Sequence, residues 1–237
     1  MHADYYRNTL YPLQDTVLRV MSPLPIGFYL TGGTALSRAY LHHRYSHDLD
    51  FFVNRDDTFK QDIELILKAL ADTHLSPKVA VADAGFVLLQ IPADGCSLKM
   101  GFVVDVPFRS GTPVQTPVFK RTDTAQNILS NKLMALSRSE PKDIVDIVFI
   151  SRQISFVWKN IMADAVRKDM WVDPVSVAHI LDTFPLHHLD DIAWIVPRPS
   201  PHWFREQLAS VIRDILRGSP NSLHPHRDEE DSGSSPG

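Results

Sequence analysis

The chain has 237 residues, of which 44% are hydrophobic and 22% are charged, a balance typical of a globular protein that buries its own core. Its single cysteine, Cys96, excludes an internal disulfide, and the absence of about 18 consecutive apolar residues excludes a membrane-spanning helix. The polar start also lacks the apolar run of a secretory signal. We therefore expect a soluble, cytoplasmic protein that makes no contact with membranes.

The net charge of −4 is concentrated near the end of the chain. Residues 219–237 contain one arginine and four acids, so the remainder is nearly neutral. A nearly neutral body can carry a basic face, so charge neither supports nor excludes an RNA partner. Because the terminal segment is rich in serine, proline, glycine and acids, we expect residues 218–237 to form a disordered tail.

The first half of the chain mixes helical and strand-like patterns. Apolar spacing predicts a helix over residues 5–21, and two prolines then end it. A short buried strand at residues 27–31 runs into Gly32 and Gly33. Further helices are expected at residues 34–43 and 58–73. Further strands are expected at residues 48–53, 78–82, 86–91 and 97–106.

The second half reads as helical. A loop rich in proline and glycine separates the two halves, at Pro107, Gly111, Pro113 and Pro117. Thr122 or Asp123 can cap a helix that runs to about residue 138, and Pro141 fits the first turn of the next. More helices are expected at residues 158–167, 174–183 and 203–217. The prediction is an α+β fold, with a small mixed-sheet core over residues 1–118 and a helical region over residues 119–217.

Gly32 and Gly33 lie between a predicted strand and a predicted helix. Glycine allows the backbone to approach a ligand closely, and a helix N-terminus presents free backbone N–H groups that bind anions such as phosphate. A strand-to-helix turn can also need glycine for steric reasons alone, so the pair by itself is a weak indication of function.

Asp48 and Asp50 are separated by one residue at the start of a predicted strand. Side chains at positions i and i+2 of a strand point to the same side, so the two carboxylates converge. Their mutual repulsion is relieved by a divalent cation, and such oxygen ligands suit Mg²⁺, which takes its remaining coordination from water and substrate phosphates. Together with the glycine pair 15 residues upstream, the spacing predicts phosphate beside metal.

Four segments carry a family resemblance. The runs GGTALSR and SHDLDFF resemble the nucleotidyltransferase signature of a glycine turn followed by an Asp-x-Asp strand. With LKMGFVVDVPFR and NKLMALSRSEPKDIVDIV, the chain more closely resembles the AbiEii/AbiGii-type nucleotidyltransferase-like toxins of toxin–antitoxin and phage-defence systems. The resemblance covers roughly residues 26–152. It implies that the mixed-sheet core is a nucleotidyltransferase core.

The resemblance also implies site residues and ligands. Nucleotide binding would fall to Gly32, Gly33, Thr34 and Lys132, and metal binding (Mg²⁺ or Mn²⁺) to Asp48 and Asp50. The implied catalytic residues are Asp48, Asp50, Lys132 and Asp146, with Asp105, Asp143 and Arg38 as further candidates.

The chain departs from the family pattern at Gly101, where members commonly carry a third acid. The nearest carboxylate is that of Asp105, which alternation places on the same side of the strand. Four residues along a strand correspond to about 13 Å, so we expect Asp105 to be structural rather than a replacement for the missing acid.

Two histidine-containing segments are weaker candidates. His42, His43 and His47 flank the Asp-x-Asp strand and could touch substrate. The run HHLDD, at residues 187–191, could bind a metal, although short runs of this kind commonly occupy loops.

The function implied by the resemblance is metal-dependent transfer of a nucleotidyl group from a nucleoside triphosphate to an acceptor, tRNA or another RNA, with a cognate antitoxin as a further partner. One alternative is a degenerate member that binds nucleotide without transferring it, which Gly101 suggests. Another is a small-molecule transferase of the aminoglycoside-modifying type. A large acidic pocket would favour that second alternative, and a basic face would favour RNA.

Overall fold

The computed structural model describes residues 2–55 and 57–225. Its centre is a five-stranded mixed sheet with the order β1-β2-β5-β4-β3. The strands are β1 (Tyr29–Thr31), β2 (Leu49–Val53), β3 (Lys78–Ala82), β4 (Phe86–Ala93) and β5 (Cys96–Val104). β2 and β5 run parallel to each other, and the other neighbouring pairs are antiparallel. The mixed sheet predicted from the sequence is therefore present.

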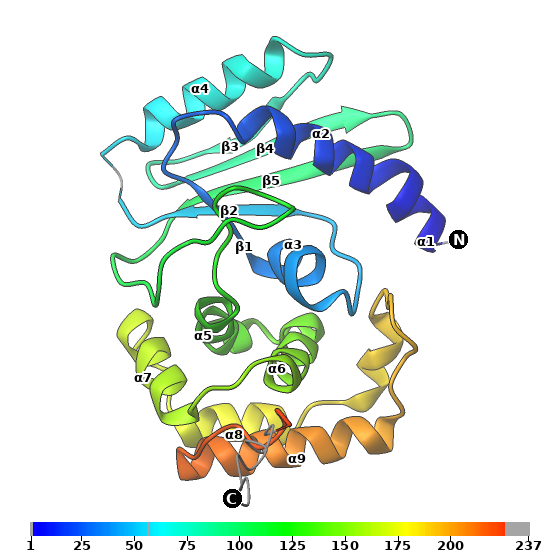
Figure 1. The fold of residues 1–237 in the computed structure, drawn as a ribbon, viewed down its shortest axis with the longest axis vertical. Coiled ribbons are helices and arrows are strands. Elements are labelled where there is room, and N and C mark those ends of the chain that lie inside the picture. The colour runs from blue at the N-terminus through cyan, green and yellow to red at the C-terminus, as the bar shows by residue number, and fades with distance from the viewer. Residues whose placement is uncertain (1, 56, 226–237) are drawn as a thin grey trace, which may run out of the picture.

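The two faces of the sheet differ because its central strands alternate between buried and partly exposed residues. On β2, Leu49, Phe51 and Val53 are buried, whereas Asp50 and Phe52 are partly exposed. The buried face packs under α2 (Tyr11–Met21) and α4 (Phe59–Ala71), as Figure 1 shows. The opposite face is open to the helical half, and it carries the candidate site.

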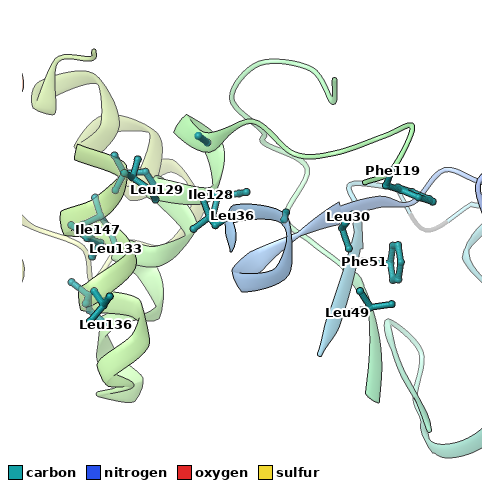
Figure 2. Packing of buried hydrophobic residues seen from close by; sticks show 14 of the residues in the cluster. Leu30, Leu36, Leu49, Phe51, Phe119, Ile128, Leu129, Leu133, Leu136 and Ile147 are labelled. Atoms are coloured by element: carbon teal, nitrogen blue, oxygen red, sulfur yellow. The ribbon is translucent and has the colours of Figure 1, made fainter. Parts of the chain in front are cut away.

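At the N-terminus, α1 (His2–Tyr5) continues through a π-helical turn (Tyr6–Leu10) into α2. After β1, the chain turns at once into α3 (Gly32–Ala35), which continues as a π-helical segment (Leu36–Leu41). Figure 2 shows Leu36 from this segment between Leu30 of the sheet and Ile128 of the helical half. This segment therefore connects the core of the sheet with that of the helices.

The second half is helical, as expected, and lies against the open face of the sheet (Figure 1). It consists of α5 (Ala125–Ala135), α6 (Pro141–Gln153), α7 (Trp158–Lys168), α8 (Pro174–Asp182) and α9 (Pro201–Arg217), with 3₁₀ turns at Leu136–Arg138 and Leu186–Asp191. Within the described ranges, no helix is long and apolar enough to cross a membrane.

The cap of α5 differs from the prediction. Thr124, rather than Thr122 or Asp123, caps the helix by accepting a hydrogen bond from the backbone N–H of Asn127. Asp123 is used elsewhere, because its buried carboxylate accepts hydrogen bonds from Thr31 and Arg109. Residues 122–124 can all cap a helix, so which of them caps α5 depends on contacts with distant parts of the chain.

The expected disordered tail begins later than predicted. Asn221 is buried, and its side-chain amide donates to the backbone carbonyls of Ser151 and Ile154. The backbone carbonyl of Ser219 accepts from the N–H of Trp158. The prediction is thus wrong for the first residues of this segment, which are fixed to the ends of α6 and α7. Residues 226–237 lie outside the described part.

Candidate active site

The open face of the sheet and the helical half enclose a cleft of about 650 Å³. Its floor is formed by the end of β1 with the glycine turn, by residues 44–48 just before β2, and by residues of β2 and the end of β5. Its wall is formed by α5, the 3₁₀ turn after it, and the start of α6. Both halves of the chain therefore contribute to one site.

Gly32 occupies the sharp turn from β1 into α3 with a φ angle of 68°. A β-carbon added at this position would lie 2.6 Å from Oδ2 of Asp50, which is closer than atoms can approach. Only glycine satisfies both the backbone angle and this contact. The turn is therefore pressed directly against the carboxylate that the sequence assigns to metal binding.

Gly33 and Thr34 pack against, or hydrogen bond to, other residues of the floor. A β-carbon on Gly33 would lie 2.8 Å from Nη2 of Arg44 and 3.0 Å from Oγ of Ser46. Thr34 is buried, and its hydroxyl donates to the backbone carbonyl of Asp48 at 2.5 Å. The hydroxyl that was expected at the triphosphate thus instead fixes the backbone that presents Asp48.

Asp48 and Asp50 both line the cleft, Asp48 just before β2 and Asp50 within it. Burial raises the pKa of Asp50, and the charge of Asp48 raises it further. Within the described chain, neither carboxylate takes part in a salt bridge or accepts a hydrogen bond. The charges of Lys132, Lys142 and Arg138 act on Asp50 in the opposite direction without forming a salt bridge with it. Two neighbouring carboxylates of this kind fit a divalent metal with oxygen ligands.

Gly101 lies directly beside Asp50 in the parallel pairing of β2 and β5. A β-carbon there would lie 3.5 Å from Oδ1 of Asp50, an ordinary contact, so the site has room for a larger side chain. Among the described residues, no group of three or more histidines, cysteines or acids is placed to hold a metal. Gly101, the position at which relatives commonly carry a third acid, is thus adjacent to Asp50, and in this chain it has no carboxylate.

Asp105 lines the same cleft but lies beyond the end of β5. Its backbone N–H donates to the carbonyl of Val53, which continues the ladder without a bulge, so the separation of about 13 Å from the Gly101 position remains. Burial raises the pKa of Asp105, a hydrogen bond from the backbone N–H of Val106 and the charge of Lys168 oppose the shift, and the charge of Asp123 adds to it. Its charged neighbours are thus Lys168 and Asp123.

Lys132 lines the wall of the cleft within a buried ionic network. Its Nζ lies 2.5 Å from Oδ1 of Asp143 and 2.8 Å from Oδ2 of Asp146. Burial alone would lower the pKa of Lys132, but the charges of Asp146 and Asp143 raise it above its ordinary value. The ammonium group therefore remains charged beside the cleft.

Asp146 lies behind the wall and is fully buried. It accepts hydrogen bonds from Nε and Nη2 of Arg44, both at 2.7 Å, and lies 2.8 Å from Nε2 of His43. Burial alone would raise the pKa of Asp146, but Arg44 and Lys132, with the hydrogen bond from His43, hold it well below its usual range. This geometry gives Asp146 the role of positioning Lys132 and Arg44.

Sequence reasoning missed Arg44 and considered His43 only as a residue that could touch substrate. Both are buried, and the Arg44–Asp146 contact spans 102 residues of sequence. No local spacing could indicate such a contact. The sequence offered only a histidine–arginine pair a few residues before the strand of Asp50. His47, by contrast, does line the cleft, where Tyr6 is its neighbour.

The remaining candidates lie elsewhere. Arg38 forms a salt bridge with Asp15 at 2.5 Å and lies over the ring of Tyr11, so it fixes the N-terminal helix rather than lining the cleft. In the HHLDD run, the exposed His188 lies 2.8 Å from Asp191 in a 3₁₀ turn. The cleft wall also presents two exposed cations, Arg138 and Lys142.

This chain is similar to one protein family in sequence and to several solved structures in fold. The family described as "Nucleotidyl transferase AbiEii toxin, Type IV TA system" matches residues 17–227. Among solved structures, MenT4, a nucleotidyltransferase toxin from Mycobacterium tuberculosis H37Rv, is 16% identical with a TM-score of 0.57, covering 88% of this chain and 86% of that chain. JHP933 from Helicobacter pylori is 16% identical with a TM-score of 0.55, covering 89% and 93%.

No match was found among the curated proteins. The structural likeness shows the shared fold, whereas the family match extends over most of the chain, including both sides of the cleft. This protein therefore belongs to the AbiEii family of nucleotidyl transferase toxins of type IV toxin–antitoxin systems.

Proposed function

We propose that this protein transfers a nucleotidyl group from a nucleoside triphosphate to a hydroxyl group of an RNA acceptor such as tRNA, with Mg²⁺ or Mn²⁺. The observation that carries the proposal is the contact between Gly32 and Asp50, where a β-carbon would lie 2.6 Å from Oδ2. This contact places the glycine turn, which would bind phosphate, next to a carboxylate that forms no salt bridge and would bind metal. A metal-bound phosphate needs these two groups side by side.

Each side of the cleft has a distinct task. Backbone N–H groups after Gly32 would bind the triphosphate, and Asp48 and Asp50 would hold the metal. Lys132, kept charged by its two acids, would direct a fixed positive charge toward the phosphates. When bound, the metal supplies further positive charge that stabilises the phosphates during transfer.

In the reaction, the acceptor hydroxyl oxygen forms a bond with the α-phosphorus, and its proton passes to water. The bond between the α-phosphorus and the oxygen that bridges to the β-phosphorus breaks, and pyrophosphate leaves with the electron pair. Fixed charge that is already in place for the phosphates lowers the barrier, because little has to reorganise during the step.

The charges of the cleft support an anionic acceptor over a cationic small molecule. The lining contains five acids, of which the Asp143 carboxylate is already paired with Lys132. A divalent metal would compensate the charges of Asp48 and Asp50, while Arg138 and Lys142 are exposed on the wall. Family membership also supports a cognate antitoxin as a partner that neutralises the activity.

The test is incubation with each of the four labelled nucleoside triphosphates, Mg²⁺ and total RNA, followed by a search for labelled RNA. The matched control is Asp50→Asn, which keeps the shape of the side chain and removes its charge. We expect labelled RNA with the native protein and a loss of about 100-fold or more in the variant. Nucleotide binding without label transfer would favour the degenerate alternative. In a parallel reaction with an aminoglycoside in place of RNA, label on that cationic small molecule would favour a transferase of the aminoglycoside-modifying type.

A further inference from the structure

The open face of the sheet presents its side chains in a consistent order along the cleft. Asp50 lies at one end, the apolar side chains of Phe52 and Val103 follow, and Asp105 lies at the far end. The charged end, the apolar middle and the polar end extend over about 13 Å of strand. This is the order and the scale of a nucleotide, with phosphates, a flat apolar base face and a hydrogen-bonding base edge.

Asn131, on α5, lines the same cleft, and its amide is bonded to Lys168, the cation whose charge acts on Asp105. Its Oδ1 accepts a hydrogen bond from Nζ of Lys168 at 2.5 Å, and lysine can only donate. Lys168 is itself held by Asn127 at 2.7 Å and by Ser130 at 2.6 Å. The amide nitrogen of Asn131 is therefore the end of the side chain that is left without a hydrogen-bond partner among the described residues.

Two polar atoms of the cleft lining are buried without a partner among the described residues. They are Oδ2 of Asp105, an acceptor when ionised, and Nδ2 of Asn131, a donor. Unpaired buried polar groups destabilise a protein, so such groups in a native structure call for an explanation, and a functional role is one of those known. Because both atoms are covered, a ligand reaches them only when the cleft lining adjusts, and pairing both groups favours that adjustment.

We propose that Asp105 and Asn131 recognise the base of the bound nucleoside triphosphate, with Asp105 accepting from a base N–H and Asn131 donating to a neighbouring acceptor atom of the base. The edges of nucleobases carry such neighbouring donors and acceptors. This inference rests on the proposed function. It assigns to Asp105 base selectivity rather than metal binding, consistent with its distance from Asp50.

The test measures, by calorimetry with Mg²⁺, the affinity for the four nucleoside triphosphates and for inorganic tripolyphosphate, which has no base. The variants are Asp105→Asn, which replaces one acceptor oxygen by a donor, and Asn131→Asp, which keeps an acceptor for Lys168 and removes the donor. Asp94→Asn, on an exposed turn, is the matched control. Thermal melting confirms that each variant is folded.

We expect the native protein to prefer its best base over its poorest by about tenfold or more, and each cleft variant to reduce that ratio by about tenfold. Tripolyphosphate affinity should stay unchanged in all variants. Equal selectivity in native protein and cleft variants, or an equal loss for all ligands including tripolyphosphate, would overturn the inference. If tripolyphosphate does not bind the native protein, the proposed function itself fails, and the inference fails with it.

Discussion

The two sides of the cleft treat their charges differently. On the wall, Lys132 is paired with Asp143 and Asp146, and Asp146 is paired in turn with Arg44 from the floor. On the floor, Asp48 and Asp50 take part in no salt bridge within the described residues. Removing one member of a buried charge pair strongly destabilises the folded chain, because the other charge stays buried without a partner. Unpaired like charges repel each other until a ligand of opposite charge arrives. We therefore expect substitutions in the wall to affect the folded chain most, and substitutions in the floor to affect the binding of ligands most.

The largest expected effect tests the wall. Replacing Asp146 by alanine leaves Arg44 and Lys132 with fewer partners in a buried site, so the free energy of unfolding should fall by about 3–5 kcal/mol. Asp48→Ala, at an exposed position on the floor, should change it little. Denaturant unfolding of both variants measures the contrast. Equal losses in the two variants would remove the distinction between wall and floor.

Lowering the pH should remove the stability that the Asp146 carboxylate contributes to the native protein. The pKa of Asp146 in the folded state is held well below its ordinary value of 3.8. The stability that this carboxylate contributes is therefore fully present above pH 4 and is lost as the pH falls through the lowered folded pKa. Unfolding curves of native protein and Asp146→Asn should accordingly converge as the pH is lowered below 4.

A middle-sized effect tests the floor. Gly101→Asp adds a carboxylate beside Asp50, at a position where a β-carbon makes only ordinary contact. Affinity for Mg²⁺ or Mn²⁺ should rise by roughly tenfold, because a third anionic oxygen ligand joins the site. The metal-free melting temperature should fall, because the new charge adds to the repulsion. Gly101→Asn is the matched control, and an equal gain in both variants would count against a metal site here.

The smallest expected effect tests the exposed edge of the wall. Lys142 lies 3.9 Å from Glu140, and both side chains are about half exposed. Lys142→Ala should weaken nucleoside triphosphate binding by about two- to threefold at low salt, and the difference should shrink as salt screens the charge. Lys60→Ala, exposed on α4 beyond the other face of the sheet, is the control and should show no change.

The sequence predicted the fold well where the pattern is local. The glycine turn, the alternation of β2 and most helices follow from spacing within a few residues. The buried network could not be predicted, because His43 and Arg44 meet Asp146 across more than 100 residues. Likewise, the position of the α5 cap depends on Asp123 being held by Thr31, and the ordered start of the tail depends on Asn221 meeting distant carbonyls.

Arg44 has a consequence for motion. Its guanidinium touches the backbone of the glycine turn at Gly33 and holds Asp146 of the helical half, so it joins both sides of the cleft at a buried point. Hinge closure needs an interface that can part, and here parting would leave a buried charge without its partner. We therefore expect the cleft to resist widening at its charged end. If so, ligands would enter this end of the cleft through side-chain rotation rather than through closure of one half of the chain onto the other.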